Sequence, residues 1–139
     1  MSTEKNIREA IRWFKTAEDD LDSARILKDS GKYAHSCFHS QQAAEKSLKA
    51  VWYFLDEDPW GHSIMKLIDE LEPVSSDLYQ KIEPLKRIAL VLDRFYIPTR
   101  YPDGLPDITP DVAFTGEDAL TCFSHAGKIM DVVRSVLKL

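Results

Sequence analysis

The fold is decided by residues 32–55, KYAHSCFHSQQAAEKSLKAVWYFL. One series of uncharged side chains recurs in this stretch at steps of four and three: Cys37, Gln41, Ala44, Leu48, Val51 and Leu55. An α-helix repeats every 3.6 residues, so these side chains share one face, which we expect to be buried. A second strip is small enough to let another helix approach closely: Ser36, Ser40, Ala43, Ser47 and Ala50. The pattern predicts a long central helix with more than one packed neighbour.

The opposite face of this helix carries a line of polar side chains. At about 100° per residue they fall within roughly 40° of one direction. The members are His35, His39, Gln42, Lys46, Lys49 and Tyr53. A solvated helix face usually mixes charges of both signs, but this line has no carboxylate, and Glu45 lies off it, nearer the buried face. A solvated face and an anion-binding face are both open, with His39, Lys46 and Lys49 as the candidate binding residues.

Helical spacing continues on both sides of the central stretch, and start and stop residues divide it. The predicted stops are Gly31, Pro59, Gly61 and Pro73, and the predicted N-caps are Ser63, Ser75 or Ser76, and Thr115 with Asp118 in a capping box. Pro84 predicts a kink or a fresh helix start. We therefore expect an all-α, antiparallel up-down bundle of four main helices plus a short extra helix, in a single domain over residues 1–139.

A long proline-rich loop precedes the last helix. It covers residues 94–114, RFYIPTRYPDGLPDITPDVAF, and we call it the strap. Prolines at positions 98, 102, 106 and 110 exclude a continuous helix, so most of the strap is expected to run extended. Its apolar content exceeds that of a solvated linker, and a loop of this length inside a compact domain is usually functional. We expect the strap to pack over the bundle and to hold its two arginines in place.

Arg100 has the clearest binding chemistry in the strap. Arg94 lies at a helix end, where a cation is favourable for the helix dipole alone. Arg100 has no such role, and its planar fork suits a phosphate or a carboxylate. Asp103 offers a carboxylate within the same turn, so an internal contact and an anion-binding role are both open. Tyr96 and Tyr101 could each offer a ring face to a base.

Composition excludes several classes of protein. The chain has 18 Lys and Arg against 23 Asp and Glu, and a net charge of −5 argues against a strongly basic, general nucleic-acid binder. His35 and His39 are four residues apart, but no carboxylate or cysteine completes a ligand set, so we predict no metal or cofactor. No apolar run reaches transmembrane length, and the start is too charged for a signal peptide. We expect a cytoplasmic protein, with Cys37 and Cys122 packed as small apolar side chains.

Three strings together resemble HEPN domains, the higher eukaryotes and prokaryotes nucleotide-binding domains. They are HSQQAAEKSLKAVWYFL at 39–55, GHSIMKLIDEL at 61–71 and YIPTRYPD at 96–103, and the resemblance extends from about residue 7 to the C-terminus. It implies a bundle of about five helices, usually a homodimer, with a link to nucleotides or to a minimal nucleotidyltransferase encoded beside it. The matching positions implied as ligand-binding are Lys46, Lys49, His62 and residues 100–103.

One branch of this family consists of metal-independent ribonucleases, including toxins. Their motif is an arginine followed after four to six residues by a histidine. No arginine of this chain has that spacing: FYIPTRY follows Arg94 and YPDGLPD follows Arg100. Without the motif histidine the acid and base of RNA cleavage are unassigned, so we predict no catalytic residue. Only His39 or His62 could substitute, through space.

Three functions follow as alternatives. The favoured one is a non-catalytic binder of a nucleotide or another phosphate-bearing ligand, or a partner of a nucleotidyltransferase, in which Lys46, Lys49 and Arg100 meet phosphates. The second is a ribonuclease toxin of a toxin–antitoxin pair, acting on RNA. The third is a purely structural interaction module.

Overall fold

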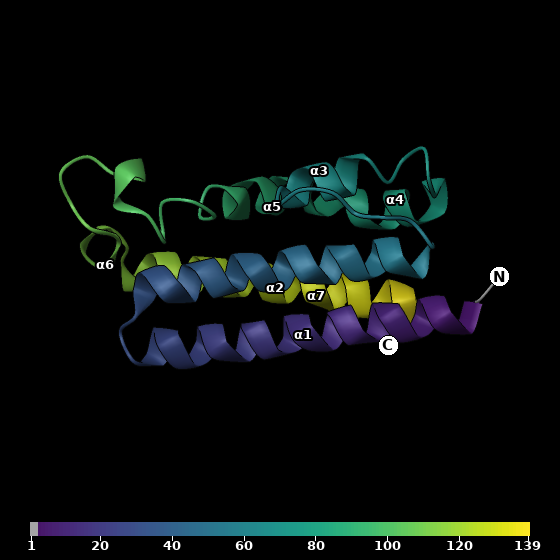
Figure 1. The fold of residues 1–139 in the computed structure, drawn as a ribbon, viewed down its shortest axis with the longest axis horizontal. Coiled ribbons are helices and arrows are strands. Elements are labelled where there is room, and N and C mark those ends of the chain that lie inside the picture. The colour runs from purple at the N-terminus through teal and green to yellow at the C-terminus, as the bar shows by residue number, and fades with distance from the viewer. Residues whose placement is uncertain (1–2) are drawn as a thin grey trace.

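The computed structural model describes residues 3–139, and helices without strands build this range. The long helices are α1 (Thr3–Asp29), α2 (Tyr33–Phe54) and α7 (Gly116–Leu137). α2 packs along both α1 and α7 and is the central helix (Figure 1). A layer of shorter helices lies on the side of α2 away from α1: α3 (Ile64–Asp69), α4 (Ser76–Ile82) and α5 (Lys86–Asp93). The prediction of an all-α antiparallel bundle is confirmed.

Helix starts follow the predicted caps. The side chain of Ser63 accepts a hydrogen bond from the backbone N–H of the first turn of α3, and Ser75 does the same for α4. Thr115 and Asp118 form the full capping box at the start of α7. Pro84 lies in a single turn of 3-10 helix, Glu83–Leu85, which separates α4 from α5. The predicted fresh start at this proline is therefore confirmed.

α2 ends earlier than the sequence suggested. Its last residue is Phe54, four residues before Asp58-Pro59. Asp56 has a φ of 59°, in the left-handed region, and this conformation stops the helix before Pro59 is reached. Gly61 then takes a φ of 83°, a value that glycine adopts without strain.

Both predicted packing strips of α2 are buried. The seam residues Cys37, Gln41, Ala44, Leu48 and Val51 are fully enclosed, and Leu55 is partly so. Ser36 Oγ donates to the carbonyl of Ala24 at 2.7 Å, which places the small strip directly against α1. On another side, Trp52 Nε1 donates to the carbonyl of Leu67 at 3.0 Å. Contacts with α1, α3 and α7 therefore fix the rotation of α2. Along its polar line His35 is exposed, whereas His39, Gln42, Lys46, Lys49 and Tyr53 are partly buried.

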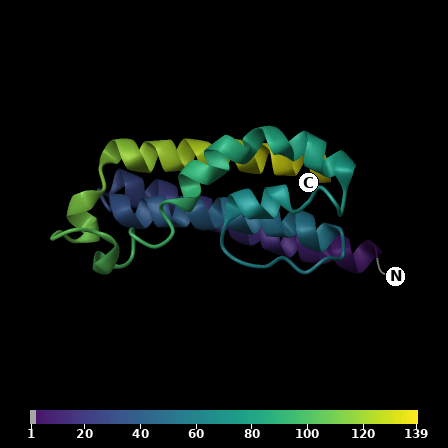
Figure 2. The same ribbon diagram turned by 90° about the horizontal axis from the view of Figure 1, so that it is seen from above.

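The strap lies at the end of the bundle where α1 turns into α2 (Figure 2). The prediction that most of the strap runs extended is wrong, because turns and short helical segments make up most of it. Residues Pro102–Gly104 form a 3-10 turn and Pro110–Ala113 form the short helix α6. Proline is favoured at the first position of a helix because its missing N–H is not needed there, so prolines that block a long helix can still start short ones.

Only part of the strap packs on the bundle. The Phe95 and Phe114 rings meet with centroids 5.7 Å apart, and Thr99 is buried. Tyr101 and Val112 are exposed, Val112 to 67%. The expectation that the apolar residues of the strap cover the bundle is therefore correct for Phe95, which packs against the core, and wrong for Ile97, Tyr101, Ile108 and Val112, which are exposed.

Both cysteines are buried inside the bundle, as the sequence predicted. Cys37 and Cys122 are free and buried, and the contact with Cys37 together with burial raises the pKa of the Cys122 thiol. The Cys122 thiol is therefore poorly suited to react at neutral pH. Within residues 3–139, no helix combines the length and the apolar character needed to cross a bilayer.

Candidate functional site

Aromatic rings hold Arg100 in place. Its guanidinium carbon lies 4.5 Å from the ring centroid of Phe38 on α2, 4.5 Å from that of Tyr96 and 4.9 Å from that of Tyr101. Its Nε donates to the carbonyl of Tyr96 at 3.0 Å. These contacts restrict the long side chain to one position and leave its two terminal nitrogens as the available donors.

No carboxylate neutralises Arg100 within the range that the structure describes. Asp103 is exposed, and no ion pair or hydrogen bond joins it to Arg100. The alternative in which these two residues form an internal contact is therefore wrong. The turn at Pro102 directs the chain away, so the ring contacts replace the carboxylate as the partner of the guanidinium.

A cavity of about 530 Å³ opens beside Arg100. Its wall is shared by the strap, by α6 and by the first turn of α2, including Lys32, Tyr33, Ala34 and His35. Lys32 precedes α2 and provides no side-chain cap. The first amide N–H groups of α2 have no intrahelical acceptor and no side-chain cap, and their residues, Tyr33, Ala34 and His35, line the cavity. The cavity unites a cationic fork and a helix end, both of which favour negative charge, with one carboxylate residue, Asp111, which accepts a hydrogen bond from Thr109.

A second cluster surrounds Glu45, whose side chain is only 3% exposed. Lys49 Nζ lies 3.0 Å and His62 Nδ1 3.2 Å from Glu45 Oε2. Gln41 Nε2 donates to the other carboxylate oxygen at 3.2 Å. The buried charge is therefore matched by an ammonium group and further polar partners, and Lys49 is committed to it.

Tyr96 joins the two clusters. The His62 ring stacks on the Tyr96 ring, with centroids 4.6 Å apart and an angle of 19° between the planes. Because Arg100 contacts the same ring, three residues predicted from the sequence are brought together here: His62, Tyr96 and Arg100. The link runs from a buried carboxylate through an imidazole and a phenol ring to a free guanidinium.

Asp93 fixes the turn that presents His62. Its carboxylate accepts hydrogen bonds from Ser63 Oγ at 2.7 Å, from the Ile64 N–H at 2.7 Å and from the Met65 N–H at 3.2 Å. This caps α3 from α5 and ties the turn to the residue just before the strap. Sequence reasoning missed Asp93; the only signal was a carboxylate directly after the apolar run of residues 88–92.

A third cluster involves Lys46 and Asp20 of α1. Lys46 Nζ lies 2.7 Å from Asp20 Oδ2, and His39 Nδ1 lies 3.7 Å from Asp20 Oδ1. Burial alone would raise the pKa of Asp20, but the contacts with His39 and Lys46 outweigh it and lower that pKa. Lys46 is therefore occupied by a carboxylate that lies 26 residues before it in the sequence, a pairing that no local pattern reveals, and His39 lies beside the same carboxylate without a hydrogen bond to it.

The remaining predicted residues lie apart from these clusters. Arg94 is the exposed C-cap of α5, and within residues 3–139 its side chain makes no hydrogen bond, ion pair or cation–π contact. Tyr101 touches Arg100 but keeps 48% of its surface exposed. No three His, Cys, Asp or Glu side chains in the described chain are grouped as a metal site would require.

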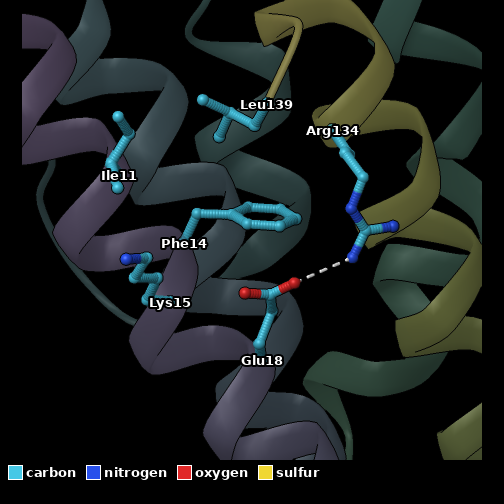
Figure 3. Close-up of a pocket in the computed structure, with 6 residues that line it drawn as sticks. All are labelled: Ile11, Phe14, Lys15, Glu18, Arg134 and Leu139. Carbon is cyan, nitrogen blue, oxygen red and sulfur yellow. Dashed lines mark hydrogen bonds and ion pairs between the residues drawn. The ribbon is translucent and has the colours of Figure 1, made fainter.

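Another cavity lies at the other end of the bundle, between α1 and α7 (Figure 3). It has a volume of about 330 Å³, and Phe14 and Ile11 form part of its wall. Its arginine, Arg134, donates to Glu18 and to Asp131, both at 3.1 Å. This guanidinium is already neutralised, so the cavity lacks the free cation that the Arg100 cavity has.

Comparison with known families finds a match to the HEPN domain over residues 10–136. Among curated proteins, the chain is similar to one from Methanocaldococcus jannaschii named "Putative toxin MJ1304". The two are 30% identical over 145 residues, which cover 96% of this chain and 91% of that protein.

Solved structures resemble the fold closely. TT1696 from Thermus thermophilus matches with a TM-score of 0.83 and 35% identity, covering 91% of this chain and 97% of that one. ST0689, an archaeal HEPN homologue, matches with a TM-score of 0.74 and 35% identity, covering 93% and 98%. A HEPN domain protein of Thermotoga maritima matches with a TM-score of 0.70 and 31% identity, covering 91% and 98%.

Proposed function

The chain belongs to the HEPN domain family, and from this premise we propose that it binds a phosphate-bearing ligand, such as a nucleotide, at Arg100. The main observation in support is that the Arg100 guanidinium is held in position without being neutralised. Three rings and one carbonyl hold it, no carboxylate in the described chain neutralises it, and it lines a cavity of about 530 Å³. An arginine fork in this state is ready to donate to two phosphate oxygens at once.

Pre-organisation strengthens the argument. An arginine side chain in water loses rotamer freedom on binding, which costs about 0.5–1.5 kcal/mol per immobilised side chain. Stacking on Phe38 and Tyr96 has already fixed Arg100 in the free protein. The guanidinium is also weakly hydrated compared with an ammonium group, so its contact with a phosphate costs less desolvation.

The cavity wall adds to the attraction for an anion. Lys32 and the first residues of α2, which have no side-chain cap, line the same cavity as Arg100. A phosphate there would meet backbone donors as well as the fork. Tyr101 is exposed next to Arg100 and could stack on the base of a nucleotide.

The cations of the α2 polar line take a supporting role in this proposal. Lys46 and Lys49 pair with Asp20 and Glu45, so we assign them to holding α2 in place rather than to direct phosphate contact. His39 belongs to the first of these pairs. Arg94 and Asp103 are assigned to the outer rim of the strap, where a larger ligand would reach them.

A melting-temperature titration tests the proposal. ATP, GTP and pyrophosphate should each stabilise the protein saturably, whereas adenosine should not, since the phosphates carry the affinity. Arg100→Gln should abolish this stabilisation. The matched control is Arg87→Gln, which removes an exposed arginine of α5 and should leave the titration unchanged. No shift with any of the phosphate compounds at millimolar concentration would contradict the proposal.

A ribonuclease is the second candidate, and one observation favours it. The buried Glu45 carboxylate orients His62 through Nδ1, and Tyr96 places this histidine near the free Arg100. A base that accepts the 2′-hydroxyl proton and a cation for the developing phosphorane charge would then lie in one cluster. The name of the M. jannaschii relative fits this alternative.

RNA cleavage by the purified protein tests the second candidate. Loss of cleavage in both His62→Ala and Arg100→Gln, with activity retained in the exposed control Lys66→Ala, would support it. Cleavage that survives in both variants would exclude this cluster as the active site.

We further propose that the protein acts as a homodimer in the cytoplasm, alone or with a nucleotidyltransferase partner. Family membership supports the dimer, and two free buried cysteines suit a reducing compartment. A nucleotidyltransferase encoded in the adjacent reading frame, and its co-purification with this chain, would support the partner. A neighbouring frame of another kind would argue against it.

A further inference from the structure

The charges of α1 follow an unusual order along the helix. Basic side chains dominate its first half, with Lys5, Arg8, Arg12 and Lys15, and acidic ones its second half, with Glu18, Asp19, Asp20, Asp22 and Asp29. A helix dipole favours the reverse order, with acids near the N-terminus and bases near the C-terminus. The stability of the isolated helix therefore does not account for this distribution.

The order is antisymmetric about Ala17. Residues at equal distances before and after Ala17 have opposite charges in four pairs: Lys15 with Asp19, Arg12 with Asp22, Glu9 with Arg25, and Lys5 with Asp29. When two copies of this helix lie antiparallel with their Ala17 residues level along the common axis, each charged member of these pairs is level with the oppositely charged member from the other copy. A parallel arrangement would bring like charges together.

One of these four pairs, Lys15 with Asp19, lies at the centre of an open face of α1, and Arg12 with Asp22 lies at about 40° from that centre. At about 100° per residue, Arg8, Lys15, Asp19 and Ile26 lie within roughly 20° of one line. All four are exposed, opposite the buried side that includes Ala17. In Figure 1, α1 forms one edge of the bundle, and no other helix covers its outer side. Lys15 and Asp19 take part in no ion pair within residues 3–139.

We propose that two copies of this chain pair through antiparallel α1 helices about a two-fold axis beside Ala17. Lys15 of each copy then faces Asp19 of the other, with Arg12 and Asp22 flanking them, and every contact occurs twice. Ile26 of each copy, which is 50% exposed in the single chain, then lies against the methylene groups of Arg8 of the other copy, at both ends of the interface. The proposal rests on the homodimer of the proposed function and adds the face and the register.

The interface is polar, so its strength should depend on salt. Exposed ion pairs are individually weak, and 0.5 M salt screens them far more than 0.05 M salt does. Arg12 and Asp22 already pair with Glu9 and Arg25 within the helix, which makes Lys15 and Asp19 the decisive contacts. We expect the dimer dissociation constant to rise at least tenfold between these two salt concentrations.

Charge exchange between copies tests both the face and the register. Sedimentation equilibrium should show a dimer for the unchanged chain and at least tenfold weaker association for Lys15→Glu and for Asp19→Lys. An equimolar mixture of the two variants should dimerise again, because both contacts regain opposite charges. The double variant should also recover. Lys66→Glu, the same change on the exposed side of α3, is the control and should not alter association.

Other results would contradict the face, the register or the homodimer separately. Single variants that dimerise like the unchanged chain would place the dimer on another face and leave the homodimer intact. Singles that fail to recover on mixing would reject the register. A monomeric unchanged chain would reject the homodimer as well, without touching phosphate binding at Arg100. If Lys15→Glu instead loses only the binding of a short single-stranded RNA, the face is a polyanion site and the pairing is wrong.

Discussion

The polar line of α2 and the strap both carry positive charge, but only the strap has a cation without a carboxylate partner in the described chain. Lys46 and Lys49 lie 2.7 Å and 3.0 Å from the oxygens of Asp20 and Glu45. Arg100 is surrounded by aromatic rings. Rings hold a cation in position without cancelling its charge, whereas carboxylates do both. The difference indicates that the partner of a basic residue, rather than its presence in a sequence pattern, decides whether it can bind an anion.

The largest effect on stability is expected from removing Glu45, the carboxylate that neutralises Lys49. Glu45→Ala leaves Lys49 in a nearly buried site without its counter-ion, and breaking a buried pair in this way costs about 3 kcal/mol of unfolding free energy. Chemical denaturation measures the change. The control Glu57→Ala removes an exposed carboxylate and should cost less than about 0.5 kcal/mol. Equal stabilities of the two variants would show that Glu45 does not neutralise Lys49 in solution.

Removing Asp93 should loosen the link between the two regions. Asp93→Ala deletes three hydrogen bonds to the start of α3, for which we expect a loss of about 2 kcal/mol. Because the same turn presents His62 to Tyr96, the ring stacking should weaken as well, which the NMR shifts of the His62 ring would report. Unchanged shifts together with lower stability would restrict Asp93 to a capping role.

Acidification should release Lys46 from Asp20. The pKa of Asp20 is lowered in the folded protein, so the ionised carboxylate stabilises the fold above its unfolded pKa of about 3.9, and this contribution is lost as pH falls through the folded pKa. Asp20→Asn should therefore cost about 1 kcal/mol at pH 7 and progressively less below pH 4. A cost that stays constant from pH 7 to pH 2.5 would contradict the Asp20–Lys46 pair.

The fold could largely be predicted from the sequence because its signals are local. Helical spacing identified the buried strips of α2, and the caps at Ser63, Ser75 and Thr115 fixed helix starts. The errors are local too. α2 ends early because Asp56 adopts a left-handed backbone conformation, which an aspartate in the sequence does not predict. The prolines of the strap exclude a long helix but start short helical turns.

The candidate site could be predicted only in part. Arg100, Tyr96 and His62 were found because an arginine in a proline-rich loop and a histidine at a helix cap stand out individually. Their partners were missed, because contacts such as that of Lys46 with Asp20 join distant segments and depend on how α1 and α2 pack. Lys32 was missed for the same reason, since only the path of the strap brings it to the cavity of Arg100.

Calorimetric titration with pyrophosphate tests the central claim most directly, by comparing the unchanged chain with Arg100→Gln and Lys46→Gln. If a cation held by rings is the one that binds phosphate, Arg100→Gln weakens the affinity at least tenfold, about 1.4 kcal/mol, and Lys46→Gln changes it less than about threefold. Equal losses in both variants, or a larger loss in Lys46→Gln, would contradict the account.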